Sequence, residues 1–140
     1  MIATKKAPGW SLGLALKEAD SAHRAALAGL NVQRLDRFVA TSGFTLGDVI
    51  GAMKLAPATL ARRRASGKLS ADESEHLLRL AMLFEQAADL FGGSAQSARE
   101  WLQTPARGLG GEIPWCSART TFGARMVEDL IGRLQYGVYT

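Results

Sequence analysis

The chain has few of the residues and segments that cross-link a protein, bind a structural metal or direct it to a membrane or to secretion. A single cysteine among 140 residues excludes an internal disulfide and a cysteine-based zinc cluster, so a reducing cytoplasm is the expected compartment. No apolar run is long enough to cross a membrane, and residues 1–9 lack the apolar stretch of a signal peptide. Valine and isoleucine are sparse and polar and apolar residues rarely alternate, which disfavours a β-sheet.

Alanine, leucine, glutamate, arginine and glutamine dominate instead, and all of them favour helix. The hydrophobic fraction of 47% is sufficient for a packed core, and the 21% of charged residues argues against disorder. We therefore expect an all-α fold. Residues 1–69 are predicted to form a helix-turn-helix domain with an additional N-terminal helix, and residues 70–140 a smaller helical domain packed against it.

Capping signals and apolar periodicity give the predicted helices. Gly43 suits a left-handed end of the helix that follows Asn31, and the apolar stripe of 71–91 is Leu77, Leu80, Ala81, Phe84 and Ala88. Ser70 and Glu73 form a capping-box pair, and Thr45 and Asp48 resemble one with the shorter acid. The predicted helices cover 11–29, the segment after the N-cap Asn31, 45–53, 57–66, 71–91, the segment from the N-cap Ser94 to 102, and the segment from the N-cap Thr121 to 136. The segment from Thr104 to Trp115 is rich in glycine and proline and is predicted to be irregular.

Charge is divided unevenly along the chain. Residues 1–70 carry eleven Lys and Arg against four acids, a net charge of +7, whereas residues 71–140 carry six Arg against nine acids, a net charge of −3. This division is typical of a nucleic-acid-binding face joined to a module with a different partner.

Residues 46–64 have the pattern of a helix-turn-helix motif. Two short helices meet across a three-residue turn, Lys54-Leu55-Ala56. The apolar contacts expected to fix their crossing are Val49, Ile50, Leu55 and Leu60. Pro57 suits the first position of the second helix, while Ala56 before it cannot cap with its side chain.

The second of these helices is the predicted recognition helix, whose first turns enter the major groove of DNA. Short side chains there contact thymine methyl groups, and arginine binds guanine or phosphate. The candidate DNA-binding residues are Ala58, Thr59, Arg62, Arg63, Arg64 and Lys68. Arg34 and Arg37 are possible flanking contacts. The simpler alternative is that the arginine triplet is only a solvated face.

No catalytic set, cofactor site or metal site is predicted. His23 and His76 fall on different helices and are expected to face solvent, and Cys116 has no neighbouring base and is compatible with an ordinary buried thiol. The Gly110-Gly111 pair lacks the following Lys-Ser/Thr of a phosphate-binding loop, so a turn is expected. We expect the chain not to be an enzyme.

Four segments in the second half carry a family resemblance. They are the residues Leu69-Ser-Ala-Asp-Glu-Ser74, Phe91-Gly-Gly93, Trp101-Leu-Gln-Thr-Pro105 with Leu109-Gly-Gly-Glu-Ile-Pro114, and Val127 to Gly137. In this order they resemble antitoxins of the Xre/MbcA/ParS type. The likeness runs from about Leu30 to Tyr139.

This resemblance implies an antitoxin with two functions. The N-terminal domain would bind the promoter of its own operon, and the C-terminal domain would neutralise a RES-type, NAD-degrading toxin by covering its active site. The implied complex is hetero-oligomeric and contains an antitoxin homodimer. Candidate toxin-binding residues are Trp101, Pro105, Leu109, Gly110, Gly111, Pro114, Tyr136, Gly137 and Tyr139.

Simpler interpretations remain for these residues and for the whole chain. Trp101 and Trp115 are more typical of a core than of a contact surface, and Tyr136 could fold back onto the last helix. A stand-alone helix-turn-helix regulator with a C-terminal dimerisation domain is the main alternative. An interaction adaptor that has lost DNA binding is a third interpretation.

Overall fold

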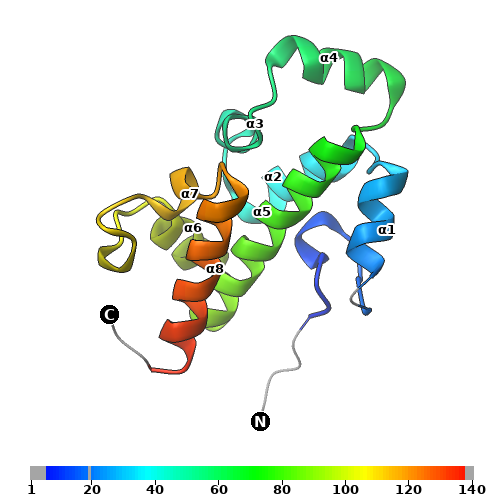
Figure 1. The fold of residues 1–140 in the computed structure, drawn as a ribbon. Coiled ribbons are helices and arrows are strands. Elements are labelled where there is room, and N and C mark those ends of the chain that lie inside the picture. The colour runs from blue at the N-terminus through cyan, green and yellow to red at the C-terminus, as the bar shows by residue number, and fades with distance from the viewer. Residues whose placement is uncertain (1–5, 19, 138–140) are drawn as a thin grey trace.

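The computed structural model describes residues 6–18 and 20–137, and within them every regular element is a helix (Figure 1). The elements are η1 (Trp10–Leu12), α1 (Ser21–Ala28), α2 (Gln33–Ser42), α3 (Leu46–Met53), α4 (Pro57–Ser66), α5 (Ala71–Leu90), α6 (Ala95–Leu102), η2 (Arg107–Leu109), α7 (Pro114–Ser117) and α8 (Thr121–Gln135). The predicted all-α fold is confirmed. None of these helices combines the length and the apolar character needed to span a membrane.

Local sequence accounts for most helix ends. At the start of α3 the Asp48 N–H donates to Thr45 Oγ1 at 3.0 Å, and the Thr45 N–H donates to the Asp48 carboxylate. Ser70 and Glu73 form the same reciprocal pair at the start of α5. Gly43 ends α2 in the left-handed conformation with φ of 79°. Both capping boxes and the exit of α2 are as predicted.

The single helix predicted over residues 11–29 is wrong in its first half. The chain forms only the short η1, turns at Gly13 with φ of 76°, and enters α1 at Ser21. The cause is a long-range contact with the buried carboxylate of Glu85 on α5. This carboxylate accepts the N–H of Gly9 at 2.8 Å and both the N–H and the hydroxyl of Ser11, at 3.0 and 2.6 Å.

Two further predictions need correction in the second half. The last helix is capped by Thr120 and not by Thr121, because the Gly123 N–H donates to Thr120 Oγ1 at 2.9 Å. The segment expected to be irregular up to Trp115 contains η2 and ends in the one-turn helix α7. Pro114 is the first residue of that helix, and its fixed φ and missing N–H suit this position.

Helix α5 lies in the middle of the molecule (Figure 1), and it supplies more buried hydrophobic residues than any other helix described. It packs against α1, α2, α3, α6 and α8. Five of its side chains, the predicted apolar stripe, have no solvent exposure: Leu77, Leu80, Ala81, Phe84 and Ala88. The predicted division at residue 70 falls at the start of this shared helix, so the two halves have one continuous core.

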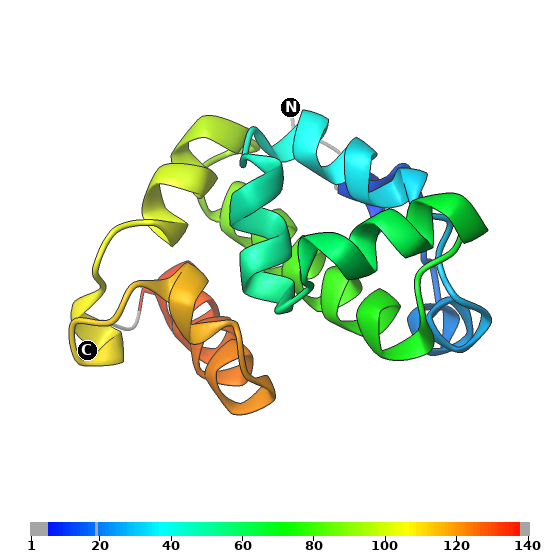
Figure 2. The ribbon, with the colours of Figure 1, turned by 90° about the horizontal axis from the view of Figure 1, so that it is seen from above.

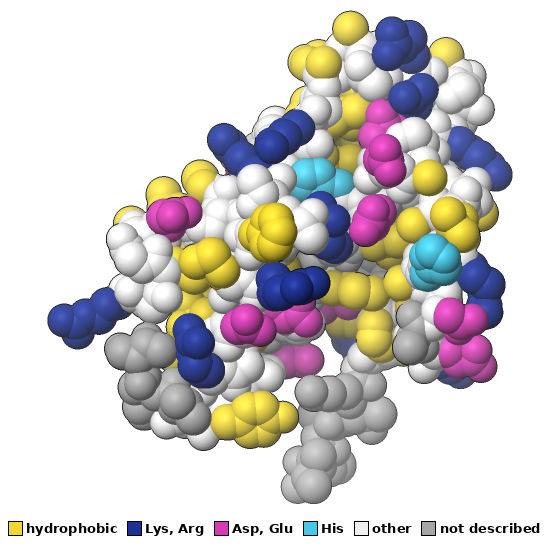
Figure 3. Space-filling view, in the orientation of Figure 1, with side chains coloured by type: hydrophobic (Ala, Val, Ile, Leu, Met, Phe, Trp, Pro, Cys, Tyr) yellow, Lys and Arg dark blue, Asp and Glu magenta, His cyan; other side chains and the backbone are white. Residues whose placement is uncertain are grey.

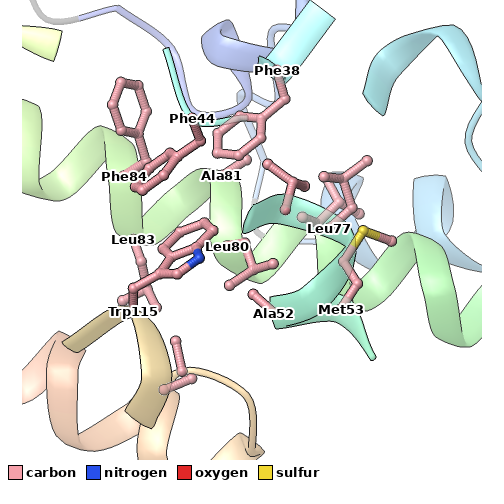
Figure 4. Packing of buried hydrophobic residues seen from close by; sticks show 14 of the residues in the cluster. Phe38, Phe44, Ala52, Met53, Leu77, Leu80, Ala81, Leu83, Phe84 and Trp115 are labelled. Carbon is pink, nitrogen blue, oxygen red and sulfur yellow. The ribbon is translucent and has the colours of Figure 1, made fainter. Parts of the chain in front are cut away.

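An aromatic cluster lies where the two halves meet (Figure 4). Phe84 of α5 contacts Phe38 of α2 edge-on at a centroid distance of 5.7 Å. Phe44, between α2 and α3, stacks on Trp115 of α7 at 4.0 Å, with 14° between the ring planes. The Trp115 indole N–H donates to the Asp48 carbonyl at 3.1 Å. These contacts fix α7 against the side of α3.

The Glu85 contacts predict how the N-terminal segment is held. Burial raises the pKa of Glu85, while the hydrogen bonds from Ser11 and Gly9 act in the opposite direction. Glu85→Ala leaves the Gly9 and Ser11 N–H groups without their acceptor. We expect it to lower the free energy of unfolding by about 3 kcal/mol, because unsatisfied buried donors are costly.

Chemical denaturation measures this loss, and hydrogen exchange at residues 9–14 reports local release of the segment. Gln86→Ala, at the neighbouring half-buried position, is the control. Unchanged exchange at residues 9–14 in Glu85→Ala would show that the carboxylate does not hold the segment.

Candidate functional site

Helices α3 and α4 form the predicted helix-turn-helix. Lys54 makes the turn in the left-handed conformation with φ of 57°, and its N–H bonds to the carbonyls of Ile50 and Gly51. Ala52 is the buried small residue at this crossing, whereas a side chain at Gly51 would meet open space. Val49, Leu55 and Leu60 are buried as predicted, and Ile50 packs against them with partial exposure.

Helix α4 projects at one end of the molecule, and Leu60 is its only buried residue (Figures 1 and 2). Its outward face carries four exposed residues at helical spacing: Ala58, Ala61, Arg62 and Ala65. Thr59 is half-buried, and its hydroxyl oxygen accepts a hydrogen bond from Arg62 at 3.3 Å. Such short side chains allow close approach to the floor of a major groove, and Arg62 can reach a base edge or a phosphate.

Arg63 does not point away from the protein. Its Nε and one terminal nitrogen donate to the two carboxylate oxygens of Glu73 on α5, at 2.8 and 3.1 Å. The same carboxylate caps Ser70, so it connects α4 to the start of α5. The pKa of Glu73 is lowered, mainly by the Arg63 hydrogen bond and against the effect of its own burial.

Arg64 is paired in the same way on the other side of α4. Its two terminal nitrogens donate to the carboxylate of Asp36 on α2, both at 2.9 Å, and this pairing lowers the pKa of Asp36. Within the described part of the chain, Arg62 is therefore the member of the triplet without an acidic partner. Lys68 is exposed just after α4, and Arg34 donates to the carbonyls of Leu12 and Gly13.

The loop between α6 and α7 holds most of the candidate toxin-binding residues. Pro105, Gly110 and Gly111 are exposed and Trp101 is half-buried. Leu109 and Pro114 are buried and belong to the core on which the loop rests. The loop is closed by hydrogen bonds from the Ala106 N–H to the Glu112 carbonyl and from the Gly111 N–H to the Ala106 carbonyl, both at 3.0 Å.

The end of α8 presents a second candidate surface. Tyr136 is 85% exposed and does not fold back onto the helix, and Gly137 follows it. Tyr139 lies outside the described residues. Sequence reasoning missed two other exposed apolar side chains of α8, Phe122 at 80% and Met126 at 49%. The sequence could have indicated this exposure, because both residues lie off the stripe of buried residues that includes Val127 and Ile131.

Two predictions about single residues near the junction of the halves are wrong. His76 is half-buried, its Nε2 has no hydrogen-bond partner in the described structure, and burial lowers its pKa, with nearby Arg79 adding to the effect. Cys116 is exposed and not buried. It lines a hollow of about 290 Å³ between α3 and the second half, together with Gly47, Gly51 and Arg119.

Comparison with known proteins decides which family has this architecture. Residues 21–82 match the antitoxin Xre-like helix-turn-helix domain, and residues 86–137 match the antitoxin Xre/MbcA/ParS C-terminal toxin-binding domain. The chain belongs to the Xre antitoxin family. The two matched ranges meet inside α5, the helix that both halves share.

Two relatives support the assignment over most of their length. Antitoxin Xre of Yersinia enterocolitica is 34% identical over 113 residues, which are 80% of this chain and 76% of the relative. Antitoxin Xre of Photorhabdus laumondii is 35% identical over 111 residues, 79% and 75% of the two chains. The family has a toxin-binding domain, so a toxin is a partner of this chain, and the helix-turn-helix makes it a DNA-binding regulator.

The two ion pairs predict how attachment of α4 depends on pH. The carboxyl pKa values of Glu73 and Asp36 are lowered from their ordinary 4.5 and 3.8. The stability that these groups contribute is therefore complete above those values and is lost as the pH falls through the lowered ones.

The variant Asp36→Asn/Glu73→Gln tests this dependence. It should melt below the wild type at pH 7 and converge with it as the pH falls below 3.8. Comparing the two melting curves at each pH removes the opposing contribution of Glu85. A difference that stays constant down to acid pH would contradict the prediction.

Proposed function

We propose that this antitoxin neutralises a RES-type, NAD-degrading toxin by placing its last residues over the mouth of the toxin's active site. We further propose that it binds the promoter of its own operon as a dimer. The observation that carries the first proposal is the exposed end of the toxin-binding module, where Tyr136 stands free after α8. An aromatic ring that is apolar and ends in a hydroxyl is typical of interface hot spots.

The loop between α6 and α7 supports the same proposal. Its exposed residues Pro105, Gly110 and Gly111 rest on buried Leu109 and Pro114, so the loop is held in place before any partner binds. A contact surface that is already ordered loses less entropy on binding. In this proposal Leu109 and Pro114 support the contact surface, while Trp101, Tyr136, Gly137 and Tyr139 contribute to it.

Co-expression with the protein encoded by the adjacent reading frame tests toxin capture. The wild type should relieve growth arrest and restore cellular NAD, and Tyr136→Ala should weaken relief because it removes an exposed anchor. Phe122→Ala, an equally exposed aromatic at the other end of α8, is the matched control.

The outcomes separate the parts of this proposal. No relief by the wild type would reject that neighbour as the target. Relief of growth arrest without any change in NAD would reject the RES type. If Phe122→Ala fails to relieve growth arrest while Tyr136→Ala still relieves it, the proposed contact at the end of the chain would be rejected.

The proposal that the chain binds its own promoter depends on α4. Its outward face of three alanines and Arg62 suits close approach to bases, and the ion pairs of Arg63 and Arg64 fix its orientation. In a dimer, two copies of α4 would occupy successive major grooves of a palindromic site. Captured toxin would then alter transcription through the same chain.

Arg62→Ala should weaken binding to the operon's own promoter by about 1 to 3 kcal/mol if Arg62 bonds a guanine. A loss of similar size on unrelated DNA would indicate a phosphate contact instead. Fluorescence anisotropy at several salt concentrations measures both cases. Arg107→Ala, in the loop of the toxin-binding module, is the control and should bind as the wild type does. Unchanged affinity in Arg62→Ala would remove this residue from the interface.

A further inference from the structure

The ion pairs of α4 leave few cations for the DNA backbone. Arg63 and Arg64 both bind acids, so the recognition helix and its end offer Arg62 and Lys68. Non-specific affinity for DNA rises with the number of phosphates that a protein neutralises. Further phosphate contacts would have to come from cations beside α4 that no acid occupies.

Lys54 is such a cation, and its backbone is unusual. It is the only residue other than glycine with positive φ in the described part of the chain. Glycine adopts this conformation without strain, whereas a residue with a Cβ atom does not. The side chain is exposed in the turn directly before α4 and has no ion pair among the described residues. Strain at a surface turn points to a use for the lysine side chain.

Arg119 is a second such cation, and it comes from the toxin-binding module. It lies between α7 and α8, is exposed, and lines the hollow beside α3 together with Gly47, Asp48 and Gly51. The two glycines leave that side of α3 open, because a side chain at Gly51 would meet no neighbour. Asp48 also lines the hollow, but its carboxylate is engaged in the cap of α3.

The two cations belong to one region of the surface. His76 of α5 lies close to the backbone of Met53 and of Ala118, the neighbours of Lys54 and Arg119 in the chain. In the view from above, α3 lies between α4 and α7 (Figure 2). The space-filling view shows Lys and Arg side chains at this end of the molecule as well as elsewhere on the same face (Figure 3). Trp115 holds α7 rigidly against α3 through its ring stack and its bond to the Asp48 carbonyl.

We propose that Lys54 and Arg119 contact the phosphate backbone of DNA beside the groove that α4 enters. The inference rests on the proposed DNA binding by α4 and extends the interface from the helix-turn-helix into the toxin-binding module. Through Arg119 the toxin-binding module itself would supply part of the DNA contact.

Binding to a duplex from directly upstream of the gene, and to a mixed-sequence duplex of equal length, tests the proposal as a function of salt. Arg119→Gln should weaken both complexes several-fold and reduce the slope of log K against log salt by about 0.9. Lys54→Gly should have the same effect on DNA while raising the melting temperature, because glycine relieves the strained turn. Arg133→Gln, near the opposite end of α8, is the matched control for charge.

The outcomes distinguish this inference from the function on which it depends. Wild-type slopes in Arg119→Gln and Lys54→Gly, with a normal slope in the wild type, would overturn the inference and leave DNA binding by α4 intact. An equal reduction in Arg133→Gln would overturn it too, because the effect would then reflect net charge alone. A wild type without affinity or salt dependence would overturn both.

Discussion

The stack of Phe44 on Trp115 joins the two functional parts of this antitoxin. Phe44 lies between α2 and α3, so it belongs to the helix-turn-helix half. Trp115 lies in α7, which belongs to the second half. The indole N–H satisfies a carbonyl of α3, and Arg99 of α6 does the same for the last turn of α2 at 2.8 Å. A bare hydrophobic contact permits sliding, but these directed bonds fix one orientation. The candidate DNA-binding and toxin-binding surfaces are consequently parts of one rigid arrangement around α5.

Helix α4 contrasts with this rigid centre. It buries one leucine and is otherwise held by two bidentate ion pairs and by the short backbone pairing of residues 30–32 with 67–69. Ion pairs near the surface are weak and sensitive to salt. Bidentate geometry nevertheless fixes the direction of an arginine, and two such pairs on opposite sides of a helix restrict its rotation. Within a basic first half, these two arginines therefore position the recognition helix.

The sequence was sufficient for most features that depend on neighbours along the chain. Both capping boxes, the helix-turn-helix and the stripe of α5 were predicted because each is set within a few residues. The prediction of a single helix over residues 11–29 was wrong because Glu85, more than seventy positions away, accepts the N–H groups of Gly9 and Ser11. The same reason applies to Arg64, whose partner Asp36 is 28 residues distant. The start of α7 had a local signal in Pro114 that the glycine-rich surroundings obscured.

Contacts between residues far apart in the sequence also explain why the sequence predicted the fold better than it predicted which cations are available for DNA. A run of three arginines supplies three positive charges in sequence, but only contacts decide which of them remain available. Here the acids of α2 and α5 take two, so Arg62 is the cation left available on α4 and further ones must lie around the helix. Lys54 and Arg119 come from the turn and from the other half, and Trp115 fixes the distance between their elements. In the proposed interface, the module that would bind the toxin therefore also supplies a DNA contact through Arg119.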